Sequence, residues 1–175
     1  LVRCYHRFRY QVLKTVRFSR LAFYQLGADD YLWHQFNQIA RGNESGLLEE
    51  WRPNRGGRTY DRKGIPLPGR VPWLSLHDAS RQFQNRAIRG GWATRGLVIR
   101  RWSAMLGGEP VAPHASVFRT DSAGVASANV ELSPPPGIEV LRAGDFVEAE
   151  VELLIVPMLA EDYYGPNSNL RVSLE

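Results

Sequence analysis

Hydrophobic and polar residues alternate over long stretches of this chain, which is the pattern of β-strands that bury one face. The clearest example runs from Phe146 to Pro157, where branched apolar residues alternate with three glutamates. Similar patterns predict one long strand from Val2 to Phe18, a second at 21–26 that Gly27 ends, and a strand or bent hairpin from Trp92 to Leu106. Shorter strands are predicted at 46–51, 71–77, 115–119, 126–132 and 139–142.

Turn residues separate these stretches at short intervals, so about eight to ten strands predict an all-β fold, specifically an antiparallel β-sandwich. One short helix is expected near residues 31–41, with Asp29 or Asp30 as its N-cap and apolar residues at helical spacing. The segment from Arg52 to Arg70 is rich in Gly, Pro and Arg, and we expect an open loop there. The 175 residues suit a single domain, 1–175.

Several protein classes are excluded at this point. The longest apolar runs are far shorter than the roughly 20 residues of a membrane-spanning helix, so we expect no membrane span. The single cysteine, Cys4, forms no internal disulfide and is expected to be buried and inert. The chain has no initiator Met and begins inside a strand-like pattern, so we expect a piece excised from a larger protein. Its compartment stays open; a secreted or periplasmic location follows only if the protein handles carbohydrate.

The net charge of +4 hides a division between the two halves of the chain. Residues 1–101 carry 19 Arg and Lys against 7 Asp and Glu, whereas residues 102–175 carry 3 against 11. Basic strands beside acidic ones would cancel this difference within a sheet. Alternatively, a basic face binds a polyanion, since 20 of the 22 basic residues are Arg, whose planar guanidinium matches carboxylate and sulfate.

Nucleic acid is not the expected polyanion, because the chain has no helix-turn-helix, zinc-finger, basic-zipper or ribonucleoprotein pattern. An anionic polysaccharide remains as the expected partner, alongside the rest of a larger chain or further copies in a homo-oligomer.

Three stretches carry a resemblance to a known group of domains: FRYQVLKTVRFSRLAFYQLGADDY at 8–31, GDFVEAEVELLIVP at 144–157 and EDYYGPNSNLR at 161–171. Together they resemble the galactose-mutarotase-like β-sandwich domains of polysaccharide lyases and some glycoside hydrolases. The resemblance implies a sandwich that binds or acts on polysaccharide. It includes no diagnostic catalytic motif, so no catalytic residue is carried over.

Sugar recognition needs flat aromatic surfaces for the ring faces and planar polar groups for hydroxyls and carboxylates. Residues of both kinds gather around the Arg-rich segment 52–70, which we expect to form one rim of the site. The candidate substrate-binding residues are Trp51, Arg55, Arg58, Tyr60, Arg70 and Trp73. The alternatives are core packing for the tryptophans and a solvated surface for the arginines.

Catalysis would need further groups. A lyase acting on uronates needs a base, for which the candidates are Tyr60, His77 and His34, and a cation such as Arg55, Arg58 or Arg70 to neutralise the carboxylate. A hydrolase needs two carboxylates across the bond that it cleaves. Glu49, Glu50, Asp61 and Asp78 are available, although adjacent Glu49 and Glu50 should point to opposite faces of a strand.

No cofactor is expected. Asp29, Asp30 and His34 lie close in sequence but do not form a transition-metal ligand set, so any metal would be calcium held by scattered oxygens. Three functions follow as hypotheses. The first is a carbohydrate-recognising domain that prefers acidic glycans, the second is a catalytic lyase or hydrolase domain, and the third is a structural subunit of an assembly.

Overall fold

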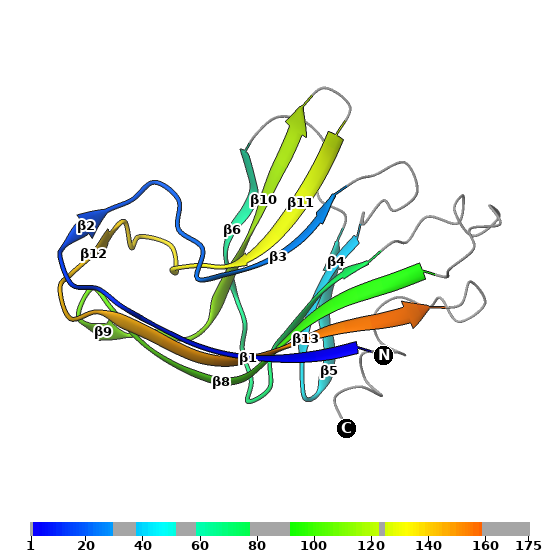
Figure 1. Ribbon diagram of the computed structural model, residues 1–175, viewed down its shortest axis with the longest axis horizontal. Helices are drawn as coiled ribbons and strands as arrows, with labels where there is room; N and C mark the ends of the chain where they lie inside the picture. Colours follow the sequence, from blue (N-terminus) through cyan, green and yellow to red (C-terminus); the bar gives the residue numbers. More distant parts are fainter. Residues whose placement is uncertain (1, 30–37, 52–58, 78–91, 123–124, 159–175) are drawn as a thin grey trace.

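The computed structural model describes residues 2–29, 38–51, 59–77, 92–122 and 125–158 (Figure 1). Every regular element in these ranges is a β-strand, and all strand pairs are antiparallel. No helix in this part of the chain is long and apolar enough to cross a membrane. The predicted all-β, antiparallel sandwich is therefore confirmed.

The larger sheet contains seven strands. Its order is β1 (Val2–Gln11), β13 (Phe146–Met158), β8 (Trp92–Leu106), β7 (Trp73–His77), β4 (Gln38–Asn43) and β5 (Gly46–Trp51), with β9 (Glu109–Pro110) paired to β8.

The smaller sheet has the order β3 (Tyr24–Asp29), β11 (Val125–Leu132), β10 (His114–Ser122) and β6 (Thr59–Pro66). A two-stranded ribbon of β2 (Val16–Arg17) and β12 (Val140–Leu141) lies beside them. Figure 1 shows the small sheet running at a steep angle to the large one.

The hydrophobic core lies between the two sheets, because each contributes its inward-facing residues to one cluster. Leu97 and Ile99 of β8 belong to it from the large sheet, and Val117 and Val130 belong to it from the small sheet; none of these four side chains is more than 2% exposed. A second, smaller cluster covers the outer face of the large sheet and contains Ala40, Trp73, Val98 and Leu154. The centre of the large sheet is therefore covered on both faces.

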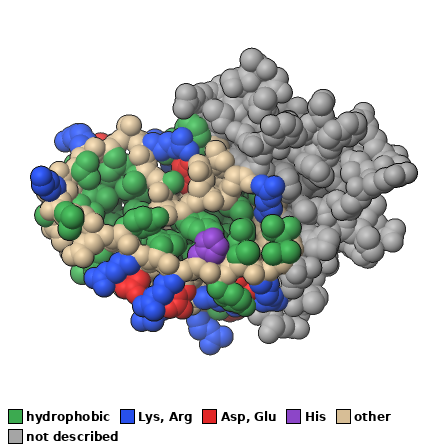
Figure 2. All heavy atoms as spheres, viewed as in Figure 1, with side chains coloured by type: hydrophobic (Ala, Val, Ile, Leu, Met, Phe, Trp, Pro, Cys, Tyr) green, Lys and Arg blue, Asp and Glu red, His purple; other side chains and the backbone are tan. Residues whose placement is uncertain are grey.

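The two sides of the sandwich are closed by different chemistry. On one side, edge strands β1 and β3 meet through an aromatic stack, in which Tyr24 lies parallel to Phe8 at 5.8 Å and edge-on to His6. On the other side, edge strands β5 and β6 meet through an ion pair between Glu49 and Arg62. In Figure 2, hydrophobic side chains gather across the middle of the described face.

Ion pairs across strands cancel much of the charge division noted in the sequence. Glutamates of β13 lie between arginines of β1 and β8, and blue and red side chains alternate along the lower margin of Figure 2. The carboxylate of Glu152 accepts bonds from Arg3 at 2.8 Å and from Arg100 at 2.8 and 2.5 Å, although its side chain has no exposed surface. The cancelling interpretation of the charge division is thus correct for these three strands.

The predicted helix at 31–41 is wrong for its final part, because residues 38–41 belong to β4; residues 31–37 lie outside the described part of the chain. Strand β4 pairs with both β5 and β7, and its neighbours Ile39 and Ala40 are buried on opposite faces of the sheet. A strand covered on both faces shows no alternation, so its apolar run resembles a helix.

Other boundaries needed correction as well. The predicted strand 2–18 ends at Gln11, and Val16–Arg17 pairs separately with β12. Gly27 does not end its strand; it pairs with Asn129, whose Oδ1 would lie 2.8 Å from any Cβ at this position. The predicted open loop 52–70 contains β6, whose irregular register against β10 hides the strand pattern. By contrast, strands 46–51 and 92–106 have the predicted bounds.

We expect Arg100→Ala to lower the free energy of unfolding by at least about 2 kcal/mol, because it leaves the buried carboxylate of Glu152 with one cation instead of two. The adjacent Arg101 is 65% exposed and lies 3.9 Å from Glu150, so Arg101→Ala should cost less than about 1 kcal/mol. Urea unfolding followed by tryptophan fluorescence measures both. Equal losses in the two variants would contradict a structural role for the buried ion pair.

Candidate functional site

An open cleft of about 540 Å³ lies beside strands β6 and β10. We call it the Tyr60 cleft. It is lined by residues 17–21, by residues 133–139, by Tyr60, Lys63 and Gly64 of β6, and by Ser116 of β10. A cleft of this volume is in the usual range for small-molecule sites, about 300 to 1,000 Å³.

Backbone contacts between distant segments build the walls of the Tyr60 cleft. The amide of Phe18 donates to the carbonyl of Glu139 at 3.1 Å, next to the pairing of β2 with β12. Gly64 has a φ of +62°, and a Cβ at this position would lie 2.1 Å from Cγ of Pro136. Only glycine suits this conformation and close approach, so Gly64 allows the proline-rich wall to pack against β6.

Arg20 is held at the cleft by a buried carboxylate. The side chain of Glu131 has no exposed surface, and it forms an ion pair with Arg20 and accepts a 3.0 Å hydrogen bond from Gln25. The guanidinium of Arg20 also lies over the ring of Phe118, 3.6 Å from its centroid. An ion pair and a cation–π contact together fix this side chain in one orientation.

Tyr60 lies edge-on to Phe118 at 5.1 Å, and the ammonium of Lys63 lies 4.5 Å from its ring centroid. Burial raises the pKa of the Tyr60 phenol, and the negative charge of Glu131 raises it further, while Arg20 opposes the shift. The phenol is therefore protonated at neutral pH and is suited to donate a hydrogen bond. This state does not favour the role of base for which the sequence made Tyr60 a candidate.

The chemistry of the Tyr60 cleft suits an anion. Among its described lining residues, the cations are Arg17, Arg20 and Lys63, and the only carboxylate is that of Glu139. Arg17 and Lys63 are exposed. The hydroxyls of Ser116 and Ser133 are 2.8 Å apart and add neutral hydrogen-bonding groups. A hydrolase would need a second accessible carboxylate across the cleft, and Glu131 is buried beneath Arg20.

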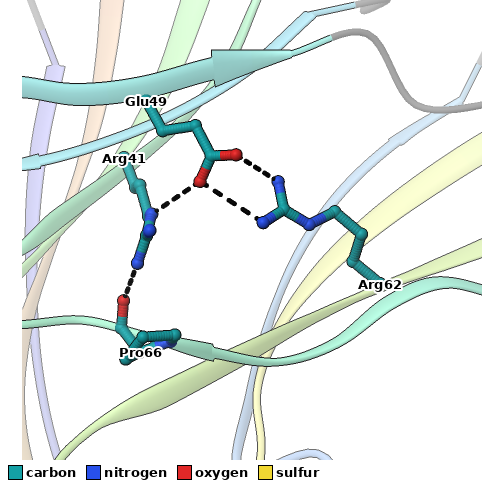
Figure 3. Close-up of polar contacts among 4 residues, drawn as sticks. All are labelled: Arg41, Glu49, Arg62 and Pro66. Carbon is teal, nitrogen blue, oxygen red and sulfur yellow. Dashed lines mark hydrogen bonds and ion pairs between the residues drawn. The ribbon is translucent and has the colours of Figure 1, made fainter.

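Trp51, another candidate from the sequence, lies at the side of the sandwich closed by Glu49 and Arg62. The guanidinium of Arg62 lies 4.4 Å from the Trp51 ring and donates to both oxygens of Glu49, at 2.7 and 3.3 Å (Figure 3). Arg41 donates to the same carboxylate at 3.0 Å and to the carbonyl of Pro66. Arg62 covers this face of the Trp51 ring, so the cluster joins the two sheets and does not present that face to a sugar.

Trp73 is only 2% exposed, and its indole NH donates to the carbonyl of Asn43 at 3.1 Å. Its ring packs over Gly42, where a Cβ would lie 2.1 Å from the indole, so it is a packing residue. Arg70 lies apart from the Tyr60 cleft and lines a second pocket, of about 450 Å³, beside β8.

Several other candidates lie wholly or partly outside the described residues. His34, Arg55 and Arg58 lie outside the described residues, as does the carboxylate candidate Asp78. His77 ends β7, but its side chain is not described.

Three residues of the Tyr60 cleft were missed in the sequence: Arg17, Arg20 and Lys63. Arg17 and Arg20 fell in or next to a predicted strand, where nothing local distinguishes them from other surface arginines. Both line the cleft through contacts with distant segments: Arg17 pairs with Val140 of β12, and Arg20 forms an ion pair with Glu131 of β11. Lys63 could have been found, since it lies three residues from Tyr60 and is one of two lysines in the chain.

Comparisons with protein-family models, with curated proteins and with solved structures gave no match to this chain. Within the described residues, no group of three or more His, Cys, Asp or Glu side chains is placed to hold a metal ion. The side chains of Asp29, Asp30 and His34 fall outside this set, so the weak calcium expectation remains a prediction.

We expect Glu49→Gln to destabilise the protein in a pH-dependent way. Hydrogen bonds from Arg62, and the charges of Arg62 and Arg41, lower the pKa of Glu49 below its ordinary value of 4.5. The ionised form of Glu49 therefore stabilises the folded state fully at pH values above its ordinary pKa of 4.5. This contribution is lost as the pH falls through the lowered pKa of the folded state.

The free energy of unfolding of the native protein and the variant, measured in urea from pH 7 to about pH 3, should differ most at pH 7 and converge in acid. Glu109→Gln, at an exposed position on β9, serves as the control. A difference for Glu49→Gln that does not change with pH would show that the carboxylate charge is not the cause.

Proposed function

We propose that this domain recognises an acidic glycan and that the Tyr60 cleft binds a uronate residue of that glycan. The observation that carries the proposal is the gathering of three cations around one tyrosine in an open cleft with a single lining carboxylate among the described residues. A sugar ring with a carboxylate needs this combination of positive charge, hydroxyl partners and apolar surface.

The cations of the cleft have distinct roles in this proposal. Arg20 is already paired with Glu131, so it contributes a fixed wall and a partly neutralised charge. Lys63 and Arg17 are exposed at the cleft, and they supply the charge that attracts the uronate carboxylate. The protonated phenol of Tyr60 donates a hydrogen bond to a ring or hydroxyl oxygen, and the Pro134–Pro136 wall offers apolar contact.

Recognition is a better-supported function than catalysis by this cleft. Proton abstraction from a uronate needs a base close to the neutralising cation, and the Tyr60 phenol is protonated at neutral pH. The fixed, paired arrangement of Arg20 favours binding a charge over transferring a proton. A polysaccharide lyase or hydrolase remains the alternative, with assembly as the third. The following measurements test recognition and distinguish it from a lyase.

We expect Lys63→Gln to weaken the binding of oligogalacturonate by about tenfold, because a hydrogen bond or ion pair to a charged partner contributes about 1.5 kcal/mol. Lys14→Gln removes an exposed lysine from outside the cleft lining and should leave the affinity within about twofold. Isothermal titration calorimetry at low and at physiological ionic strength measures both variants.

The methyl ester of the same oligosaccharide is a matched ligand that lacks the charge. It should bind more weakly than the free acid and without salt dependence. Equal binding of acid and ester, or equal effects of the two lysine variants, would overturn the proposal. Absorbance near 235 nm that rises with time would show an unsaturated uronate product, and so would favour a lyase.

A further inference from the structure

A second pocket, lined partly by Arg70, is rich in arginine and has no role in the proposal above. It has a volume of about 450 Å³ and is lined by residues 69, 70 and 72, residues 99–102 and residues 110–113. Three of these residues are arginines, namely Arg70, Arg100 and Arg101, and no lining residue is acidic among those described. We call it the Arg70 pocket.

A β-bulge brings two of these arginines to one place. In the pairing of β8 with β13, Ile99 lies opposite Val151 and Arg101 lies opposite Glu150, so Arg100 has no partner of its own. Consecutive residues of a regular strand point to opposite faces, and an extra residue in one strand breaks this rule. The bulge explains why both Arg100 and Arg101 line the same pocket.

Hydrogen bonds hold several of the segments that line the pocket. Arg100 is oriented by the buried carboxylate of Glu152, which accepts bonds from its Nε and its Nη2. The turn that carries Arg70 is held by the carboxylate of Glu44, which accepts the backbone amides of Arg70 and Val71 at 2.9 to 3.1 Å. The indole NH of Trp102 donates to the carbonyl of Val111 at 2.9 Å, and both residues line the pocket.

The charges of the pocket are only partly compensated within the described part of the chain. Glu152 is shared between Arg3 and Arg100, and Arg101 has a long 3.9 Å contact with Glu150. The carboxylate of Glu150 also lies 3.9 Å from Arg7. Three arginines therefore line the pocket without a lining carboxylate among the described residues, while Glu44 interacts with Arg70, and Glu150 and Glu152 are each shared with an arginine of β1. This arrangement leaves donors for an anion from outside the chain.

We infer that the Arg70 pocket binds a tetrahedral oxyanion, presented as a sulfate ester on the glycan. Three terminal oxygens of such a group match the planar donor forks of three arginines better than the two oxygens of a carboxylate. This assignment of the glycan as the source rests on the proposed function. A phosphate group has the same shape, so the test includes both anions.

The first experiment uses inorganic sulfate on the full chain, so its outcome does not depend on any glycan. Sodium sulfate is titrated at constant ionic strength against sodium chloride, and the Nε–Hε signals of the arginines are followed by ¹H–¹⁵N NMR. Saturable shifts at Arg100 and Arg101 are expected. Arg101→Gln should weaken sulfate binding by about fivefold or more, because it removes one charged donor fork.

Arg9→Gln is the matched control. Arg9 is on the same sheet, is 60% exposed and lies 3.9 Å from Glu148, so it matches Arg101 in exposure and in its long contact with a glutamate of β13, and it lies outside the pocket. It should leave sulfate binding unchanged within about twofold. Equal losses in the two variants, or arginine signals that respond to chloride as they do to sulfate, would overturn the oxyanion site.

The second experiment identifies the source of the anion. A sulfated glycosaminoglycan oligosaccharide and its desulfated form are titrated into the native protein, Arg101→Gln and Lys63→Gln, with inorganic phosphate in parallel. If desulfation lowers the affinity of the native protein but not that of Arg101→Gln, the sulfate ester is supported as the ligand of the Arg70 pocket. Tight phosphate binding without any effect of desulfation would overturn it in favour of a phosphate ligand. The desulfated form still carries the uronate carboxylates, so its affinity for Lys63→Gln reports on the Tyr60 cleft only. The two proposals can therefore fail independently of each other.

Discussion

Two glutamate carboxylates buried without exposed surface, Glu131 and Glu152, impose the arrangement of charge in this protein. A buried carboxylate is costly unless cations neutralise it, and here each one draws arginine side chains across neighbouring strands or segments. Glu131 fixes Arg20 at the Tyr60 cleft, and Glu152 fixes Arg100 in the Arg70 pocket. In each sheet, therefore, a buried glutamate–arginine ion pair also orients one guanidinium at an open pocket.

This arrangement requires arginine, and not lysine, at both of these positions. Arg100 bonds a buried carboxylate through two nitrogens while its planar group borders a pocket, and Arg20 combines an ion pair with stacking over Phe118. Lysine has a single charged nitrogen and could not hold these geometries. Part of the division between a basic and an acidic half of the sequence arises because the arginine-bearing strands β1 and β8 lie on either side of the glutamates of β13.

Much of the fold could be predicted from the sequence, because hydrophobic and polar residues alternate along several strands and turn residues separate them. Strands 46–51 and 92–106 were predicted with their observed bounds. Prediction failed where burial on both faces removes alternation, as at Ile39 and Ala40, or where bulges interrupt it, as in β6. The residues of the Tyr60 cleft were harder to predict than the strands. Tyr60 was named from its chemistry, and Lys63 lies on the same strand, but Arg17 and Arg20 come to the cleft from a distant segment, which periodicity does not reveal.

The arginines of β1 also bear on how copies of the protein behave toward one another. Strand β1 is an edge of the large sheet, so its outer backbone groups lack a neighbouring strand in the described structure. If two such edges paired antiparallel about His6, Arg3 of one copy would lie opposite Arg9 of the other. Like charges placed opposite each other repel. The arginines of β1 that form ion pairs with β13 therefore also disfavour pairing between the β1 edges of two copies.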